Sequence, residues 1–198
     1  TTLEGGMITT NDKRFADRAR LMRSHGMTKT AYDREKKYAW YYDVTELGYN
    51  YRMNEVEASI GISQLKKLDQ MNEQRQEKAK YLTEKLSHIK GIIPPHEAEN
   101  RNHIFHLYVI RVLADSFGIN RDRLFEKLSK EGIGLSLHYT PLHLLSFYKS
   151  KYGYKKGDFP VAERLYNEIL SLPVYPQISE EQLDFVIEQI ASNAITGK

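Results

Sequence analysis

The 198-residue chain contains no cysteine, one tryptophan and six prolines. Without cysteine it can form no disulfide, use no thiolate nucleophile and bind no zinc through sulfur. No apolar run approaches the roughly 18 residues that a membrane-spanning helix needs. The missing cysteines are compatible with a reducing compartment. We therefore expect a cytoplasmic protein without a membrane partner.

The chain also lacks a strong excess of charge. Its 29 Lys and Arg residues are interleaved with 26 Asp and Glu residues, and the formal net charge is only +3. This pattern is typical of solvated helix faces and too weak to indicate a nucleic-acid partner. The hydrophobic fraction of 40% is ordinary for a soluble globular protein, and the length allows one large or two small domains.

Tyrosine, by contrast, is abundant. Many of the 14 tyrosines fall in two segments, residues 38–51 and 147–154. Aromatic loops of this kind often line a site for a planar or sugar-like ligand, and packing within the protein is the alternative. Residues 28–46 have no clean period and are long for a connection, which is typical of functional or mobile loops.

The most informative stretch is residues 47–69. It opens as a glycine-marked aromatic loop and becomes a helix at Asn54, a good N-cap, with Glu55 and Glu57 in the first turn. Apolar residues then follow at helical spacing. The loop thus delivers Asn50 and Arg52 to the start of a buried helix. From spacing alone, a helix start with incidental polar residues remains the alternative.

Local signals predict the other elements of the first part of the chain. Residues 5–10 are expected to form a turn and a short strand, and Asn11-Asp12 to cap a helix that ends near Arg23. The helix that starts at Asn54 is expected to run, with or without a kink, to about Ile89. Gly91 to Pro95 is the clearest boundary signal.

An alternation of strands and helices follows, which favours an α+β arrangement with a small sheet covered by helices. Leu124, Phe125 and Leu128 should face inward. The predicted elements are strands at His106–Val112 and Ile133–Tyr139, helices at Asn120–Lys130, Phe159–Leu170 and Glu180–Ala191, and a short apolar run at Leu172–Tyr175.

Few residues can be assigned chemistry from their pattern. A proline-containing loop after a strand would present His138 and Tyr139 at the rim of a cleft, although a structural role is the default for each histidine. His138 and His143 lie five residues apart, but no third ligand has suitable spacing, so we predict no metal site. No nucleophile–base pair, P-loop or Rossmann glycine pattern is present.

Seven segments, in order and spread over most of the chain, resemble the DegT/DnrJ/EryC1/StrS family. These are pyridoxal-phosphate enzymes of nucleotide-sugar metabolism, mostly aminotransferases. The segments are LEGGMITTND, RLMRSHGM, ELGYNYRMNEVEASIGISQL, HLYVIRV, LHYTPLH, GDFPVAERL and LSLPVYP. The resemblance implies the C-terminal portion of an α/β aminotransferase fold, fold type I, with an α+β C-terminal part and pyridoxal 5'-phosphate as cofactor.

The resemblance also implies a division of the chain. Residues 1–75 would be the end of the large cofactor-binding domain with the start of a linking helix, and residues 76–198 the small C-terminal domain. In this family the Schiff-base lysine stands a few residues before a TTxEGG segment, and the chain opens with that segment at Thr1. We therefore expect a longer protein whose catalytic lysine lies upstream of Thr1, and no catalytic residue can be named here.

Five residues match family positions that bind ligands. Asn50 matches an asparagine that reaches across a homodimer to the cofactor phosphate. Arg52 matches a position near the substrate diphosphate, which suits the planar fork of arginine. His138, Tyr139 and Tyr148 match positions that contact the nucleotide-sugar. The resemblance places residues 28–46 near the dimer contact and the substrate entrance.

The implied reaction is transfer of an amino group, with glutamate as donor, to a keto sugar of a nucleotide-sugar, in polysaccharide or amino-sugar biosynthesis. One alternative is a sugar dehydratase of the same family, in which histidine replaces the lysine. Another is a non-catalytic regulatory fragment. The residue that separates these readings is not in this chain.

Overall fold

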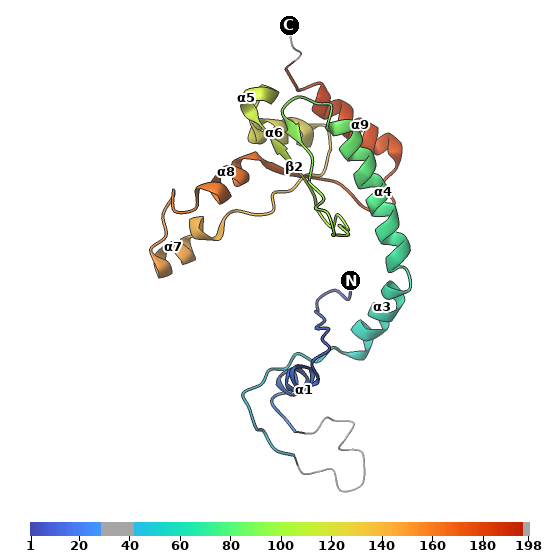
Figure 1. The fold of residues 1–198 in the computed structure, drawn as a ribbon, viewed down its shortest axis with the longest axis vertical. Coiled ribbons are helices and arrows are strands. Elements are labelled where there is room, and N and C mark those ends of the chain that lie inside the picture. Colours follow the sequence, from blue (N-terminus) through green and yellow to red (C-terminus); the bar gives the residue numbers. More distant parts are fainter. Residues whose placement is uncertain (29–41, 196–198) are drawn as a thin grey trace. The chain divides into compact units, whose positions relative to one another are not determined.

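The computed structural model describes residues 1–28 and 42–195 (Figure 1). They form two compact units, unit 1 from Thr1 to Leu68 and unit 2 from Asp69 to Lys198. Most of the predicted loop at 28–46 lies outside the described residues. The predicted boundary between residues 75 and 76 falls inside helix α4 (Leu68–Leu86). The assignment of these parts to a cofactor domain and a small domain stays a prediction.

Unit 1 contains helices α1 (Lys13–Met22) and α3 (Glu55–Leu65). Both begin where the capping residues predicted. The Asp12 carboxylate accepts the first free N–H groups of α1, and Asn54 forms a reciprocal capping box with Glu57. The predicted short strand at residues 5–10 is wrong. These residues pair with no described segment, and a strand needs a partner to satisfy its backbone groups.

Unit 2 contains an antiparallel sheet in the order β1-β2-β3. Figure 1 shows α4 and α9 side by side, in agreement with the hydrogen bond from the Tyr81 hydroxyl to Asp184. Helix α6 contacts α8, α9 and β3. The elements after α4 are β1 (Ile92–Ile93), β2 (Tyr108–Val112), α5 (Ala114–Phe117), α6 (Arg121–Lys130), the 3₁₀ turn η1 (Leu142–Leu144), α7 (Ser146–Tyr152), α8 (Pro160–Glu168), β3 (Ile169–Leu172) and α9 (Glu180–Ala191).

The hydrophobic core belongs to unit 2. Strand β2 buries Tyr108, Ile110 and Val112, every second residue, as a half-buried strand should. The predicted inward positions Leu124 and Leu128 are confirmed as fully buried. The other buried side chains include Ala79, Leu82 and Leu86 of α4, Leu170 and Leu172 of β3, and Leu183, Val186 and Ile190 of α9. Among the described residues, every buried hydrophobic side chain lies at residue 79 or beyond.

Two predictions for unit 2 are wrong. The strand expected at residues 133–139 is reduced to one bridge, from Ser136 to Ser171 on the free edge of β3. The helix expected to end at Leu170 ends at Glu168, since the following residues pair with β2 instead. The helix at Glu180–Ala191 is confirmed with its capping box. The long helix from Asn54 is interrupted at residues 66–67 and ends at Leu86.

Candidate functional site

In unit 1, the loop that carries Asn50 is held by backbone hydrogen bonds to the end of α1. The Tyr49 N–H donates to Met22 O at 2.7 Å, and the His25 N–H donates to Tyr49 O at 2.9 Å. The Tyr51 N–H donates to Arg23 O at 2.9 Å. These bonds fix the loop although they join segments more than 20 residues apart. Asn50 and Arg52 therefore project from a defined backbone.

Two glycines make this close approach possible. A Cβ at Gly48 would lie 2.1 Å from the backbone nitrogen of Gly26 and 2.4 Å from the carbonyl carbon of His25. A Cβ at Gly26, where φ is +69°, would lie 1.9 Å from Glu46 O. No side chain fits in either place without moving the backbone. The sequence indicated a glycine-marked loop within residues 47–69 but could not show that Gly48 faces Gly26.

Arg52 joins two polar side chains. Its Nε donates to Asn50 Oδ1 at 3.3 Å, and its Nη2 lies 3.2 Å from His25 Nε2. Because a guanidinium only donates, His25 Nε2 must accept, and the neutral His25 ring carries its proton on Nδ1. The Asn50 amide nitrogen has no partner among the described residues. All three side chains are exposed. The group thus presents amide and guanidinium donors, which suit phosphate oxygens.

His25 is a member of this group that sequence reasoning missed. The side chain of His25 is exposed. Its contact with Arg52 spans 27 residues, so no local pattern could have indicated it. Beside the group, the rings of Tyr49 and Tyr51 stack at 5.0 Å.

In unit 2, His138 and Tyr139 lie together beside β3. His138 Nδ1 is 2.8 Å from the hydroxyl of the buried Ser171, and the rings of His138 and Tyr139 meet edge to face at 4.8 Å. The peptide bond between them is cis. Tyr139 is 74% exposed. A ring held by the core and a ring open to solvent are therefore neighbours.

His143 forms a separate buried pair with Glu163. The His143 Nε2 to Glu163 Oε1 distance is 2.9 Å, and the Gly157 N–H donates to the same oxygen at 2.7 Å. These hydrogen bonds, first that of His143, lower the pKa of Glu163 below its ordinary value. A structural role was the default expectation for His143, and its buried pairing with Glu163 fits that role. Among residues 1–28 and 42–195, no three His, Asp or Glu side chains are placed to hold a metal ion.

Tyr148 belongs to a row of aromatic rings on and after α7. Its ring meets that of Phe147 edge to face at 5.4 Å and stacks with that of Tyr152 at 6.2 Å. The row continues through Tyr154 to Phe159. Lys151 lies over the rings of Phe147 and Tyr152. The structure shows no contact of Tyr148 with His138 or Tyr139 among the interactions of the described residues. The predicted site residues therefore fall into three groups.

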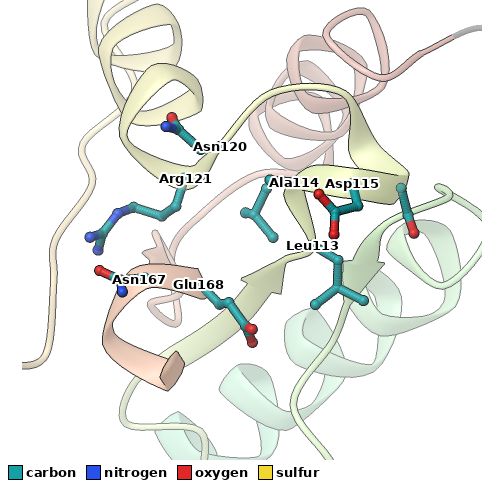
Figure 2. A pocket seen from close by; sticks show the side chains of 9 residues that line it. Leu113, Ala114, Asp115, Asn120, Arg121, Asn167 and Glu168 are labelled. Carbon is teal, nitrogen blue, oxygen red and sulfur yellow. The ribbon is translucent and has the colours of Figure 1, made fainter. Parts of the chain in front are cut away.

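Two cavities of unit 2 contain none of the predicted site residues. Figure 2 shows the first, of about 380 Å³, lined by side chains from the end of β2, from α5, from the start of α6 and from the end of α8. Two of its charged side chains are already paired, Arg121 with Asp122 and with Ile169 O, and Glu168 with Arg111. The second, of about 740 Å³, lies along α4 and residues 95–105.

No described helix is long and apolar enough to span a membrane.

Comparison with known proteins assigns the chain to a family. The model of the DegT/DnrJ/EryC1/StrS aminotransferase family matches residues 1–191. The chain belongs to this family. The spore coat polysaccharide biosynthesis protein SpsC of Bacillus subtilis is 39% identical over 191 residues, covering 96% of this chain and 49% of SpsC. A UDP-4-amino-4,6-dideoxy-N-acetyl-beta-L-altrosamine transaminase of Campylobacter jejuni is 36% identical over 196 residues, covering 97% and 48%.

Solved structures agree. The chain superimposes with a TM-score of 0.81 on Spr1654 of Streptococcus pneumoniae, a protein assigned as a sugar aminotransferase and solved in PMP and PLP forms. The two are 26% identical, and the match covers 95% of this chain and 47% of Spr1654. The DegT/DnrJ/EryC1/StrS chain spans about half the length of the relatives it matches. The predicted fold, the C-terminal portion of fold type I, and the predicted cofactor, pyridoxal phosphate, are confirmed for the family.

The residues present fit the phosphate end of that cofactor. Asn50 offers an amide donor without adding charge, and the neighbouring guanidinium of Arg52 makes the local field positive. Neither donor is buried, so a ligand can reach both. No residue of this chain is assigned to the reacting end of the cofactor.

Proposed function

We propose that the protein to which this chain belongs transfers an amino group from glutamate to the keto carbon of a nucleotide-linked sugar, as a cytoplasmic homodimer. The family model that matches the chain describes aminotransferases, one relative is named for spore coat polysaccharide biosynthesis, and another is named as a UDP-amino-sugar transaminase. The observation that carries the proposal is the pair of exposed donors on the glycine-held loop, Asn50 and Arg52. Bound pyridoxal phosphate would supply the electron sink for the transfer.

Each group of residues would have its own task. Asn50 would donate its amide N–H to the cofactor phosphate bound by the second subunit. Arg52, already oriented by Asn50 and His25, would hold the diphosphate of the substrate with its remaining N–H groups. His138, Tyr139 and Tyr148 would contact the nucleotide-sugar. A planar aromatic ring suits contact with a nucleotide base, and a hydrogen-bond donor suits a phosphate oxygen.

The first test is spectroscopic. The full-length protein should show the absorbance band of lysine-bound pyridoxal phosphate, lose it on borohydride reduction, and convert to the amine form with glutamate. A colourless protein that gains no band with added cofactor would refute the aminotransferase proposal. A protein that binds the cofactor but does not convert it with glutamate would instead support the dehydratase alternative.

The second test concerns Arg52. Replacing it with alanine removes a charge-assisted contact worth roughly 1.5–3 kcal/mol, so binding of the nucleotide-sugar should weaken about tenfold to a hundredfold. The glutamate half-reaction should change much less, because glutamate has no diphosphate. Arg52→Lys keeps the positive charge but lacks the planar guanidinium fork. Its affinity for the nucleotide-sugar should lie between those of the wild type and Arg52→Ala. Equal losses in both half-reactions would mean that Arg52 only supports the loop.

A further inference from the structure

Ser171 is the residue against which the ring of His138 rests. It lies on β3, is 5% exposed, and places its hydroxyl 2.8 Å from His138 Nδ1. Its backbone is paired on both edges, with Val109 of β2 and with Ser136. The hydroxyl therefore projects from one of the most constrained positions in unit 2.

The geometry decides which atom donates. The Ser171 hydroxyl has one hydrogen, and its partner among the described residues is His138 Nδ1. If Nδ1 carried a hydrogen, it would donate to the serine oxygen, and the buried hydroxyl hydrogen would have no acceptor, which is costly. If the hydroxyl donates, every buried hydrogen of the pair is satisfied. The neutral His138 ring then carries its proton on Nε2.

We propose that Ser171 is a positioning residue that holds His138 in the Nε2–H form, so that His138 offers a hydrogen-bond donor to a phosphate or sugar oxygen of the substrate. The ligand part rests on the proposed function, and the tautomer is a property of the two residues alone. Ionised phosphate oxygens only accept hydrogen bonds. In the opposite tautomer, the unprotonated Nε2 would therefore turn its lone pair toward a lone pair of the phosphate oxygen.

His25 supplies an internal comparison. Arg52 faces its Nε2, so that nitrogen must accept and the neutral ring carries its proton on Nδ1. The chain therefore contains two histidines whose partners select opposite tautomers. A method that distinguishes the two nitrogens should report one of each.

The test uses the full-length protein with ¹⁵N-labelled histidine, without substrate, at a pH of about 8.5, where an ordinary imidazole is neutral. Imidazole ¹⁵N shifts of His138, assigned by their loss in His138→Gln, should show a protonated Nε2. Ser171→Ala should give a mixture of tautomers, and Ser171→Thr should restore the single form. Ser136→Ala, on the exposed partner of the bridge, should leave the spectrum unchanged.

A protonated Nδ1 in the wild type, or an unchanged His138 in Ser171→Ala, would overturn the proposal. An unaltered His143 signal shows that a variant is folded, because that ring is paired elsewhere. The ligand part is tested with inorganic pyrophosphate, whose binding should weaken about three- to tenfold in Ser171→Ala. A changed tautomer with unchanged pyrophosphate and nucleotide-sugar binding would reject the role of His138 toward substrate while leaving the role of Ser171 intact.

Discussion

His143 Nε2 lies 2.9 Å from Glu163 Oε1, with the two side chains only 6% and 12% exposed. The same oxygen accepts the N–H of Gly157. One carboxylate thus ties together η1, the loop before α8 and the first turns of α8, the segments on either side of the Tyr148 aromatic row. The pair is structural, and it makes the order of this region depend on the charge of Glu163.

This pair should make stability depend on acid. Because the pKa of Glu163 is lowered from its ordinary 4.5 in the folded state, its contribution is fully present above that value and is lost as the pH falls through the lower folded pKa. The free energy of unfolding of wild type and Glu163→Gln should therefore differ most above pH 4.5 and converge below it. Glu126→Gln, at an exposed carboxylate beside Arg123, is the control and should change the free energy of unfolding by no more than about 0.5 kcal/mol. If the unfolding free energies of wild type and Glu163→Gln kept the same difference at every pH, the prediction would be contradicted.

Gly48→Ala should disrupt the loop that carries Asn50. The new Cβ would lie 2.1 Å from a backbone atom of Gly26, so the loss should exceed the roughly 0.5–3 kcal/mol of a typical substitution. Hydrogen exchange in the full-length protein should rise at residues 22–28 and 46–51. Gly6→Ala has open space and should change stability by no more than about 0.5 kcal/mol. Similar protection of the amides from hydrogen exchange in both variants would mean that the loop accommodates the new Cβ at little cost in free energy.

Leu128→Ala should destabilise unit 2 strongly. The side chain is fully buried among the helices and the sheet, and its truncation leaves a cavity, so a loss of roughly 2–5 kcal/mol in the free energy of unfolding is expected. Leu142→Ala, at a 60% exposed leucine, is the matched control and should cost well under 1 kcal/mol. Denaturant titration measures both. Comparable losses of unfolding free energy in the two variants would show that Leu128 is not part of the hydrophobic core.

Asn50→Ala tests the shared site of the proposed homodimer. If Asn50 serves the cofactor of the second subunit, a two-fold interface carries two equivalent sites. Mixing full-length Asn50→Ala chains with chains that lack the Schiff-base lysine should restore about one intact site per mixed dimer. The activity of the exchanged mixture, compared with each parent alone, is the measurement. A mixture of exchanging chains no more active than its parents would place Asn50 in its own subunit's site.

Helix starts were the most predictable part of the fold. Asp12, Asn54 and Ser179 each bond to the free N–H groups that follow them, a signal that is local and chemically specific. The end of α8 was not predictable in the same way. The residues after Glu168 continue an amphipathic pattern, and only their pairing with β2, more than 50 residues away, makes them a strand.

The candidate site residues come only from resemblance to the family, and their roles stay a prediction. The pattern around Asn50 and Arg52 predicted a polar loop before a helix and nothing more. The partners that orient the predicted residues are remote, with 27 residues between His25 and Arg52 and 33 between His138 and Ser171. Propensity and periodicity act over a few residues, so such pairs emerge only when the chain is folded.

The uneven distribution of the core has a calorimetric consequence. Apolar exposure dominates the heat-capacity change on unfolding, and the buried apolar side chains of the described residues all lie in residues 69–198. Heating residues 1–198 should therefore give a heat-capacity increment of roughly 1.6–2 kcal/mol/K, the value for a domain of about 130 residues, where a uniformly packed chain of this length would give about 2.4–3. The described residues of unit 1, held by backbone hydrogen bonds, would melt with little calorimetric signature of their own.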